Sequence, residues 1–293
     1  MTSVSNRPVP ELKVETEADI QQAARHAKRR RRLWLWAARL GFAVFIVGGW
    51  QLFTTLNWVD PFFYGQPSLI WKSLVDLFTK GTEFGSIWGD IGTTLKEAVY
   101  GFFLGAVAGI IFGLLLGQVR FLADVLSPYI KIVNAVPRII LGSIFLVAFG
   151  LGTFPKVLLA AVLVFFIVFF NAFQGVREVN PNLVANLRVL GASPLQVARH
   201  VIIPSALTWI IASLHTAFGF AIIGALVGEV LGSLRGVGLV ISQAQGRLDP
   251  NTVFAGMAIM AVITLVAEYL ITLLEHRVLS WRPPSQAEVS AGL

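Results

Sequence analysis

Apolar residues are gathered along this chain into long runs, and short segments rich in polar and charged residues separate the runs. A helix needs about 20 consecutive apolar residues to cross the hydrocarbon core of a bilayer. Six runs reach that length, so the pattern predicts an all-α integral membrane protein with six transmembrane helices. The predicted spans are residues 33–56, 91–119, 126–149, 155–176, 204–231 and 252–279.

Glycines recur every four residues in the second predicted span, a spacing that places them on one face of a helix. Apolar surface alone gives helices no reason to associate in lipid, but a column of glycines lets a neighbouring helix approach closely and gain dispersion contacts. We therefore expect the second span in the middle of the bundle. The fifth span contains a shorter column of glycines with the same spacing. The two columns are Gly101, Gly105, Gly109, Gly113 and Gly117, and Gly224, Gly228 and Gly232.

Composition supports the membrane assignment, because 56% of the residues are hydrophobic and only 13% are charged. Soluble globular domains carry about twice that share of charged residues. The formal net charge is +7, but the basic residues lie at the ends of the apolar spans and form no patch interleaved with aromatic residues. We therefore expect a lipid bilayer as partner and no nucleic acid.

The positions of the basic residues also predict how the chain is oriented, because cytoplasmic loops carry an excess of Lys and Arg. The bias is best satisfied when both termini are cytoplasmic. This orientation predicts a cytoplasmic polar and basic tail over residues 1–32, a transmembrane domain over 33–283 and a cytoplasmic tail over 284–293. It also places the polar segment at 177–204 on the cytoplasmic side.

Motifs for covalent chemistry are missing from the sequence. There is no G-x-x-x-x-G-K-[ST] loop to cradle nucleotide phosphates, and the four histidines are scattered without the spacing of metal ligands. The chain contains no cysteine. We therefore expect a non-catalytic chain with no metal site and no cofactor.

The polar segment "REVNPNLVANLRVLGASPLQVARHVIIP" is patterned as two short helices. Leu183, Leu187 and Leu190 form one apolar face at helical spacing, and Gly191 can end that helix. Ser193 is a suitable cap for a second helix, with a proline following in its first turn. We expect the pair to form a compact, rigid knob, and the alternative interpretation is an ordinary interfacial helical hairpin.

The same segment resembles a known family. Gly191, nine residues, and then the run Val201-Ile202-Ile203-Pro204 are similar to the glycine and I-x-L-P portion of the cytoplasmic EAA loop in permease subunits of bacterial ABC importers. The resemblance extends over most of residues 60–283, through "AVPRIILGSIFLVAFGLGTFPKV", "FFNAFQGVREVNPNLV" and "VGEVLGSLRGVGLVI", and is closest to the nitrate, taurine and alkanesulfonate branch. One departure is that Ala185, Asn186 and Leu187 stand where the family has E-A-A, which removes a carboxylate.

The resemblance implies the type I ABC importer permease fold, in which the EAA loop serves as a coupling helix that docks in a groove of an ATPase subunit. It also implies a homodimer of two permease copies, two ABC ATPase subunits, a periplasmic or lipid-anchored solute-binding protein and a location in the cell (inner) membrane. ATP hydrolysis then belongs to the partner subunit. The expected coupling residues are Arg188, Leu190, Gly191, Ala192, Ser193, Arg199 and Pro204.

Polar residues inside the predicted spans are candidates for a solute pathway, because an ionisable group in hydrocarbon is costly. Asn134 and Arg138 share one helix face, and a guanidinium could grip a sulfonate, taurine or nitrate anion with two hydrogen bonds. The alternative for Arg138 is that it reaches the interface along its stem or pairs with Glu229. Asn171, His215 and Glu229 are further pathway candidates, and each could instead join two helices by a hydrogen bond.

The predicted function is therefore the membrane-spanning permease subunit of an ATP-driven importer for a small-molecule solute. An ion-gradient-driven secondary transporter is the main alternative, although such carriers commonly have inverted repeats or matching broken spans, which this sequence lacks. A membrane scaffold without transport activity is a second alternative, against which the polar groups within the spans argue.

Overall fold

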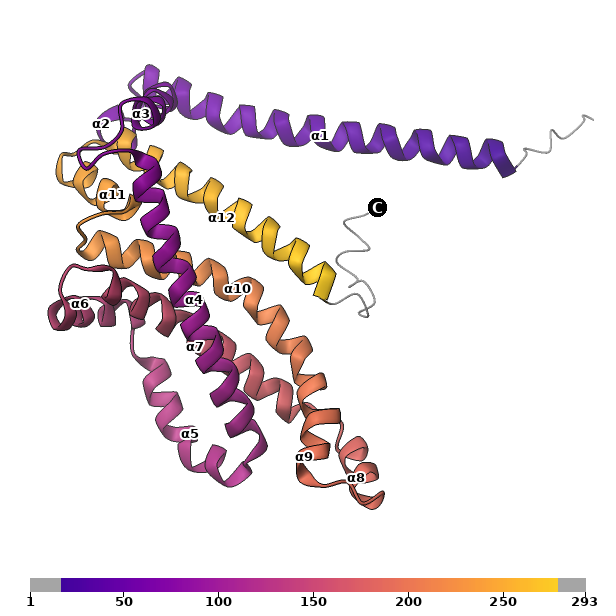
Figure 1. Ribbon diagram of the computed structural model, residues 1–293. Helices are drawn as coiled ribbons and strands as arrows, with labels where there is room; N and C mark the ends of the chain where they lie inside the picture. Colours follow the sequence, from indigo (N-terminus) through magenta and orange to yellow (C-terminus); the bar gives the residue numbers. More distant parts are fainter. Residues whose placement is uncertain (1–16, 279–293) are drawn as a thin grey trace, which may run out of the picture. The chain divides into compact units, whose positions relative to one another are not determined.

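The computed structural model describes residues 17–278, and this part of the chain is helical and contains no β-strand. The prediction of an all-α protein is confirmed (Figure 1). The elements are α1 (Glu17–Thr55), α2 (Pro61–Tyr64), α3 (Pro67–Thr79), α4 (Ile87–Gln118), α5 (Arg120–Ala135), α6 (Arg138–Phe149), α7 (Thr153–Arg177), α8 (Pro181–Val189), α9 (Pro194–Val197), the π-turn η1 (Ala198–Ile202), α10 (Ile203–Leu231), α11 (Val237–Gly246) and α12 (Pro250–Val278).

Five helices in the described residues are long and apolar enough to cross a membrane, and they correspond to five of the six predicted spans. The third predicted span differs, because two shorter helices, α5 and α6, replace one continuous helix. Pro137 separates them: its ring disfavours helical backbone at the preceding residue, and Val136 is extended with φ −69° and ψ 127°. The predicted tail 284–293 and residues 1–16 of the predicted tail 1–32 lie outside the described residues.

The chain divides into two units. The described part of the first unit is helix α1 up to Phe53, and the second unit, Thr54–Trp281, contains the remaining helices. The second unit begins with the single turn α2 and the short helix α3. Asp60 caps α2 by accepting a hydrogen bond from Phe62 N at 2.9 Å.

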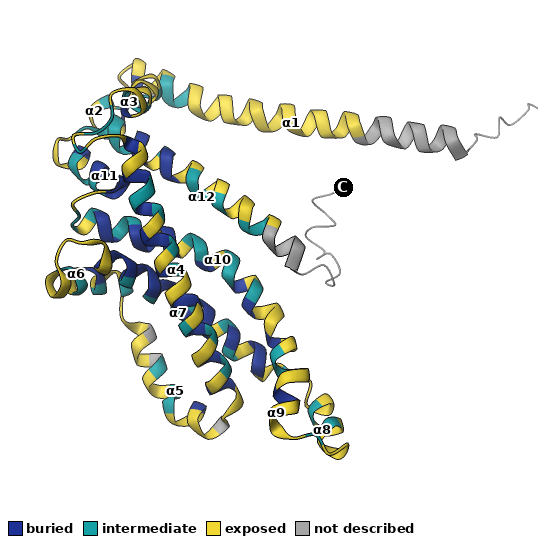
Figure 2. Cartoon of the chain, viewed as in Figure 1, coloured by how far each residue is buried: buried dark blue, intermediate teal, exposed yellow. Residues whose placement is uncertain are grey.

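Helices α4, α7 and α10 pack against one another and form the core of the second unit, and their buried residues face each other (Figure 2). The glycine column explains the packing. A Cβ atom added at Gly113 would lie 2.7 Å from Cβ of Ala172, and one added at Gly117 would lie 2.7 Å from Cβ of Val176. The second span therefore packs closely into the core through its glycines, as predicted, but the middle position that we expected for it belongs to α7.

The shorter glycine column on α10 approaches the same central helix, α7. A Cβ atom added at Gly224 would lie 2.6 Å from Cα of Ala160, and one added at Gly228 would lie 2.9 Å from Cγ of Lys156. Helix α7 is thus held between two helices that each present small residues to it, which fixes the depth of all three relative to one another.

Candidate functional site

The segment 177–204, here called the interspan segment, links α7 to α10 and contains α8, α9 and η1. Helix α8 ends where the sequence predicts, because Gly191 has φ +82°, a conformation that a side chain disfavours. Ala192 N donates to Leu187 O and Gly191 N donates to Arg188 O, each at 3.0 Å. This pair of hydrogen bonds is the Schellman motif, which fixes the direction in which the chain leaves the helix.

The predicted cap at Ser193 is confirmed, and it consists of two reciprocal hydrogen bonds, whereas the sequence predicted one. Ser193 Oγ accepts from Gln196 N at 3.3 Å, and Gln196 Oε1 accepts from Ser193 N at 2.7 Å, which completes a capping box. The S-x-x-Q spacing was a signal for this box in the sequence. The turn between α8 and α9 is therefore fixed by backbone and side-chain hydrogen bonds on both sides.

The second helix of the pair begins after Ser193 as predicted, but the expectation that it is a separate short helix is wrong. Helix α9 is a single turn that continues through η1 into α10, so that Pro194–Leu231 forms one helical course of 38 residues. Pro204 has no N–H to donate, and a helix must adjust around it. The wider π-turn just before it, in which Ile203 N donates to Ala198 O, keeps the helix unbroken.

The tip of the interspan segment exposes large apolar side chains. Val189 is 87% exposed, Leu190 is 81% exposed and Leu195 is 78% exposed, whereas Val197 on the inner side is only 2% exposed (Figure 2). Arg199 is exposed, and Ala192 beside the glycine is half-buried. A rigid turn that presents apolar and small residues outward is a suitable docking surface for another protein.

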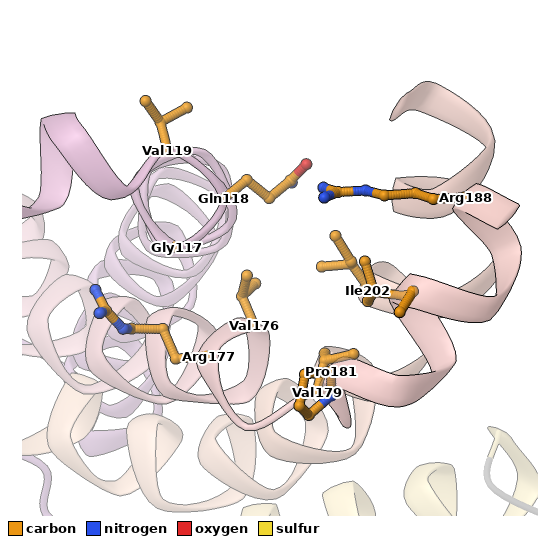
Figure 3. A pocket seen from close by; sticks show the side chains of 11 residues that line it. Gly117, Gln118, Val119, Val176, Arg177, Val179, Pro181, Arg188 and Ile202 are labelled. Atoms are coloured by element: carbon orange, nitrogen blue, oxygen red, sulfur yellow. The ribbon is translucent and has the colours of Figure 1, made fainter. Parts of the chain in front are cut away.

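A cavity of about 800 Å³ lies beside this segment, where the ends of α4 and α7 meet α8 and the end of η1. Figure 3 shows the side chains of Gln118 and Arg188 pointing toward one another across it. Arg177 also lines the cavity, and its guanidinium lies 5.4 Å from the ring centre of Phe173. Apolar side chains, including Val176, form the rest of the lining.

The predicted pathway residues have separate surroundings in the structure. Arg138 is the first residue of α6, and its guanidinium lies 4.5 Å from the ring centre of Phe166 on α7. Asn171 Nδ2 donates to the carbonyl of Ile167 in its own helix at 2.8 Å. His215 Nε2 lies 3.0 Å from Oε1 of Glu268, which joins α10 to α12. Asn134 lies on α5, and its side chain is outside the described part of the structure, so the expectation that it shares one helix face with Arg138 is wrong: the break at Pro137 places the two residues on different helices.

Glu229 is fully buried and holds the loop that follows α10. Thr94 on α4 donates to Glu229 Oε1 at 2.8 Å, and the backbone N–H of Gly238 donates to Oε2 at 2.7 Å. Thr94 Oγ1 also accepts from Val237 N at 3.0 Å. Gly236 has φ +113°, and any Cβ there would collide with the Glu229 carboxylate. The observed contacts therefore assign Glu229 the structural role that the sequence left open, joining two helices and a loop.

Sequence reasoning missed the other members of this group, here called the polar cluster: Asp90, Thr94, Glu97, Lys156 and Glu229, each 1% exposed or less. Asp90 accepts from Gly236 N at 3.2 Å and from Thr82 Oγ1 at 2.9 Å. Lys156 Nζ donates to the carbonyls of Leu151 and Gly152, which directly precede α7, at 2.6 and 2.8 Å, and interacts electrostatically with both glutamates. The signal was present, since residues 90, 94 and 97 continue the helix face that the glycine column occupies.

The sequence of this chain is similar to those of known transport proteins. Residues 105–280 match the family described as "Binding-protein-dependent transport system inner membrane component". The chain is 31% identical to a Bacillus subtilis (strain 168) protein named as an aliphatic sulfonates transport permease, SsuC, over 92% of this chain and 98% of the relative. It is 26% identical to the taurine transport system permease protein TauC of Escherichia coli (strain K12), over 86% and 94% of the two chains.

A further relative is the riboflavin transport system permease protein RibX of Chloroflexus aurantiacus, 30% identical over 79% of this chain and 85% of that protein. Among solved structures, a chain of the inward-facing MetNI methionine ABC transporter superimposes with a TM-score of 0.54 at 20% identity, covering 64% of this chain and 92% of the other. A chain of an amino acid ABC transporter gives 0.51 at 23% identity, over 65% and 93%. The predicted permease fold is therefore confirmed.

Proposed function

The chain belongs to the family of binding-protein-dependent transport system inner membrane components, and we propose that it couples ATP hydrolysis by partner subunits to the import of a small organic sulfonate or a similar anion. Family membership makes the chain a multi-pass inner-membrane component of a transport system and not an enzyme. The energy source, the solute and the assembly are the parts that we propose.

The geometry of the interspan segment carries this proposal. Its turn is fixed by the Schellman motif at Gly191 and the capping box at Ser193, and its apolar tip is exposed at Leu190. A continuous helix joins it to α10, so a displacement at the tip reaches a membrane span without passing through a loose linker. An ATPase subunit that grips the tip could therefore move the span.

We assign the contact with the ATPase to the residues predicted from the sequence: Arg188, Leu190, Gly191, Ala192, Ser193, Arg199 and Pro204. The small residues would enter a groove, and the two arginines could pair with acidic rims. Because Ala185 and its two neighbours replace the carboxylate of the family motif, the apolar tip and these arginines would carry the contact.

The proposed assembly contains two copies of this chain around one path, two ATPase subunits on the cytoplasmic side and a solute-binding protein on the other side. The interspan segment, the tail 1–32 and the tail 284–293 would then face the cytoplasm. ATP binding would close the ATPases, draw the two interspan segments together and open the path outward, and hydrolysis would reverse the change.

The proposed solute class rests on Arg138 together with the relatives that are named for sulfonate and taurine transport. The Arg138 guanidinium lies 4.5 Å from the ring centre of Phe166, a cation–π contact that helps to hold it in place. The two-pronged N–H donors of a guanidinium match two oxygens of a sulfonate. Asn134 on the preceding helix, with Asn171, His215 and Glu229, would then contribute to the path or to the helix contacts that shape it.

Transport in proteoliposomes tests the function directly. We expect radiolabelled taurine to enter vesicles that contain this chain, its ATPase and its binding protein, and only when ATP is present. Gly191→Trp should abolish co-purification of the ATPase and remove uptake. Gly150→Trp is the matched control, because Gly150 has φ +79° and, like Gly191, open space around its Cβ position. Uptake by this chain alone, driven by an ion gradient, would establish the secondary transporter instead.

The solute assignment has its own test. Arg138→Ala should lower the apparent affinity for an anionic solute by about tenfold or more, the scale of a lost charge-assisted hydrogen-bond pair, while assembly with the ATPase is unchanged. Arg138→Lys keeps the charge but loses the two-pronged hydrogen bonding of the guanidinium, so its apparent affinity for the solute should fall between those of the wild-type chain and Arg138→Ala. Unchanged uptake kinetics in Arg138→Ala would reject a role for this guanidinium in solute binding.

A further inference from the structure

Two membrane-crossing helices, α10 and α12, share a pair of ionisable residues near the middle of their length. His215 Nε2 on α10 lies 3.0 Å from Oε1 of Glu268 on α12. Each helix has 29 residues, with Ala217 and Thr264 as the middle residues, so both members of the pair lie within about one turn of the middle. An ionisable side chain at this depth is costly and commonly marks a pathway for a solute or an ion.

The pair is partly exposed, unlike the glutamates of the polar cluster. The side chain of Glu268 is 51% exposed and that of His215 is 31% exposed, whereas Glu97 and Glu229 are exposed by 1% or less. The second carboxylate oxygen of Glu268, Oε2, takes no hydrogen bond from the described part of the chain. A carboxylate oxygen in contact with lipid tails would lose its hydration without compensation. This side of the helix pair therefore meets water or a polar group.

The surface of α10 next to the pair is also unlike a lipid-facing surface. Thr208, Ala212 and Thr216 follow one another at four-residue spacing and are exposed, and His215 lies two turns after Thr208 on the same side of the helix. The exposed residues of α4 between positions 103 and 115 are all large and apolar, as expected for contact with lipid. The polar and small residues of α10 are better suited to lining an aqueous path.

The pair lies at about the same level of the bundle as Arg138. Gly224 of α10 approaches Ala160 of the antiparallel helix α7. Six residues further along α7 is Phe166, which the Arg138 guanidinium contacts, and this residue falls opposite a position of α10 within one turn of His215. A cationic group and a carboxylate are thus presented at one depth in the membrane.

We propose that Glu268 lines the solute path and binds the cationic end of a zwitterionic solute, so that the preferred substrate is an amino sulfonate and not an alkanesulfonate without an amino group. The inference rests on the proposed function, which supplies the path and assigns the sulfonate to Arg138. An ammonium group has three N–H donors, and Oε2 of Glu268 is an available acceptor. His215 holds the other oxygen and so fixes the orientation of the carboxylate.

Uptake of two solutes that differ only in the amino group tests the assignment. Proteoliposomes that contain this chain, its ATPase and its binding protein are supplied with taurine or with ethanesulfonate. We expect Glu268→Gln to lower the apparent affinity for taurine about tenfold, the scale of one lost charge-assisted hydrogen bond, and to leave ethanesulfonate uptake at its wild-type rate. Co-purification of the ATPase shows that the variant folds. Unchanged taurine uptake, or an equal loss for both solutes, would overturn the proposal.

Glu83→Gln is the matched control. Its carboxylate is 56% exposed and pairs with one cationic side chain, that of Arg247, but it lies outside the membrane-crossing helices. This variant should change the uptake of neither solute, and a loss of taurine affinity equal to that of Glu268→Gln would contradict the assignment. Glu268→Asp keeps the charge on a shorter side chain, so it should retain part of the affinity for taurine.

Water access to this face can be measured without transport, because the chain contains no native cysteine. A thiol reacts as its thiolate, which forms readily only in contact with water. In the assembled complex, Thr216→Cys should therefore react with a charged methanethiosulfonate reagent, and taurine should slow the reaction. Val107→Cys is the control on the apolar face of α4, where the native side chain is 54% exposed, and it should not react.

The labelling outcomes separate this inference from the proposed function. A Thr216→Cys chain that does not react faces lipid, and one that instead forms a disulfide with a second copy is covered by that copy. Either result would overturn the inference even if uptake depends on ATP. If Thr216→Cys reacts and taurine protects it, but uptake proceeds without ATP, the inference stands and the proposed energy source is rejected.

Discussion

The two ends of helix α4 are built in opposite ways. Near its start, Asp90 and Thr94 are buried and hydrogen-bonded to two loops and to Glu229. Near its end, about 36 Å from Thr94 at 1.5 Å per residue, Gln118 faces an open cavity next to an exposed apolar tip. Near the start of α4, polar side chains are hydrogen-bonded to other parts of the chain. Near its end, polar and apolar side chains are exposed and can contact another molecule.

This difference separates the demands of folding from those of assembly. A buried polar group that loses its partner costs free energy of unfolding, because nothing replaces the lost hydrogen bond. An exposed apolar side chain contributes little to the stability of the single chain, but its burial stabilises a complex. We therefore expect substitutions at the polar cluster to impair folding, and substitutions at the interspan segment to impair binding of the ATPase.

The largest effect is expected at Gly236, where the polar cluster meets the loop after α10. Gly236→Ala adds a Cβ that collides with the Glu229 carboxylate in a backbone conformation that only glycine adopts easily. We expect a loss of about 3 kcal/mol or more of stability, seen as a low yield of folded protein and a lowered thermal midpoint in detergent. Gly246→Ala is the control, because a Cβ there has open space, and a similar loss in both variants would contradict the explanation.

A smaller effect is expected for Thr94→Val, which keeps the shape of the side chain and removes its hydroxyl. Val237 N–H and the Glu229 carboxylate each lose a partner inside the core, which should cost about 2 kcal/mol of stability. Intrinsic tryptophan fluorescence during thermal unfolding measures the change. In Thr93→Val, the lost hydroxyl donates only to Gly89 O of its own helix, so the midpoint should stay near that of the wild-type chain.

The smallest effect on stability, within about 0.5 kcal/mol, is expected for Leu190→Ser, because this side chain is 81% exposed. Its effect on assembly should be large by comparison, since the apolar tip would no longer fill a groove of the ATPase. Thermal unfolding and co-purification from the same preparation measure the two quantities. A Leu190→Ser chain that unfolds early but retains its ATPase would reverse the comparison between the two ends of α4.

Much of the fold could be predicted because a bilayer imposes strong constraints on sequence. The long apolar runs predict five spans directly, and the glycine columns predict which helix faces allow close packing, although the helix between them is α7. The break at Pro137 was harder to foresee, because apolarity persists across residues 126–149 while a single residue interrupts the helix. Hydropathy reports how apolar a segment is, but not whether its helix is continuous.

The candidate site was predictable only where local rules apply. The glycine cap at Gly191 and the serine cap at Ser193 follow from backbone chemistry within a few residues, and both are confirmed. The bonds that join Thr94 and Asp90 to residues more than 130 positions away depend on which helices pack together. Periodicity shows that these polar residues face inward, but it does not identify their partners.

The π-turn at Ala198–Ile202 has a consequence for how this polypeptide tolerates change in length. Each residue advances a helix by about 100°, and the wide turn absorbs one residue beyond the regular repeat. Deleting a single residue there would therefore leave a regular α-helical turn and keep the direction in which Glu229 points, whereas a deletion within α10 before Glu229 would rotate that carboxylate by about 100° toward another neighbour. The π-turn is thus the position in this long helix at which the loss of one residue should disturb the buried carboxylate least.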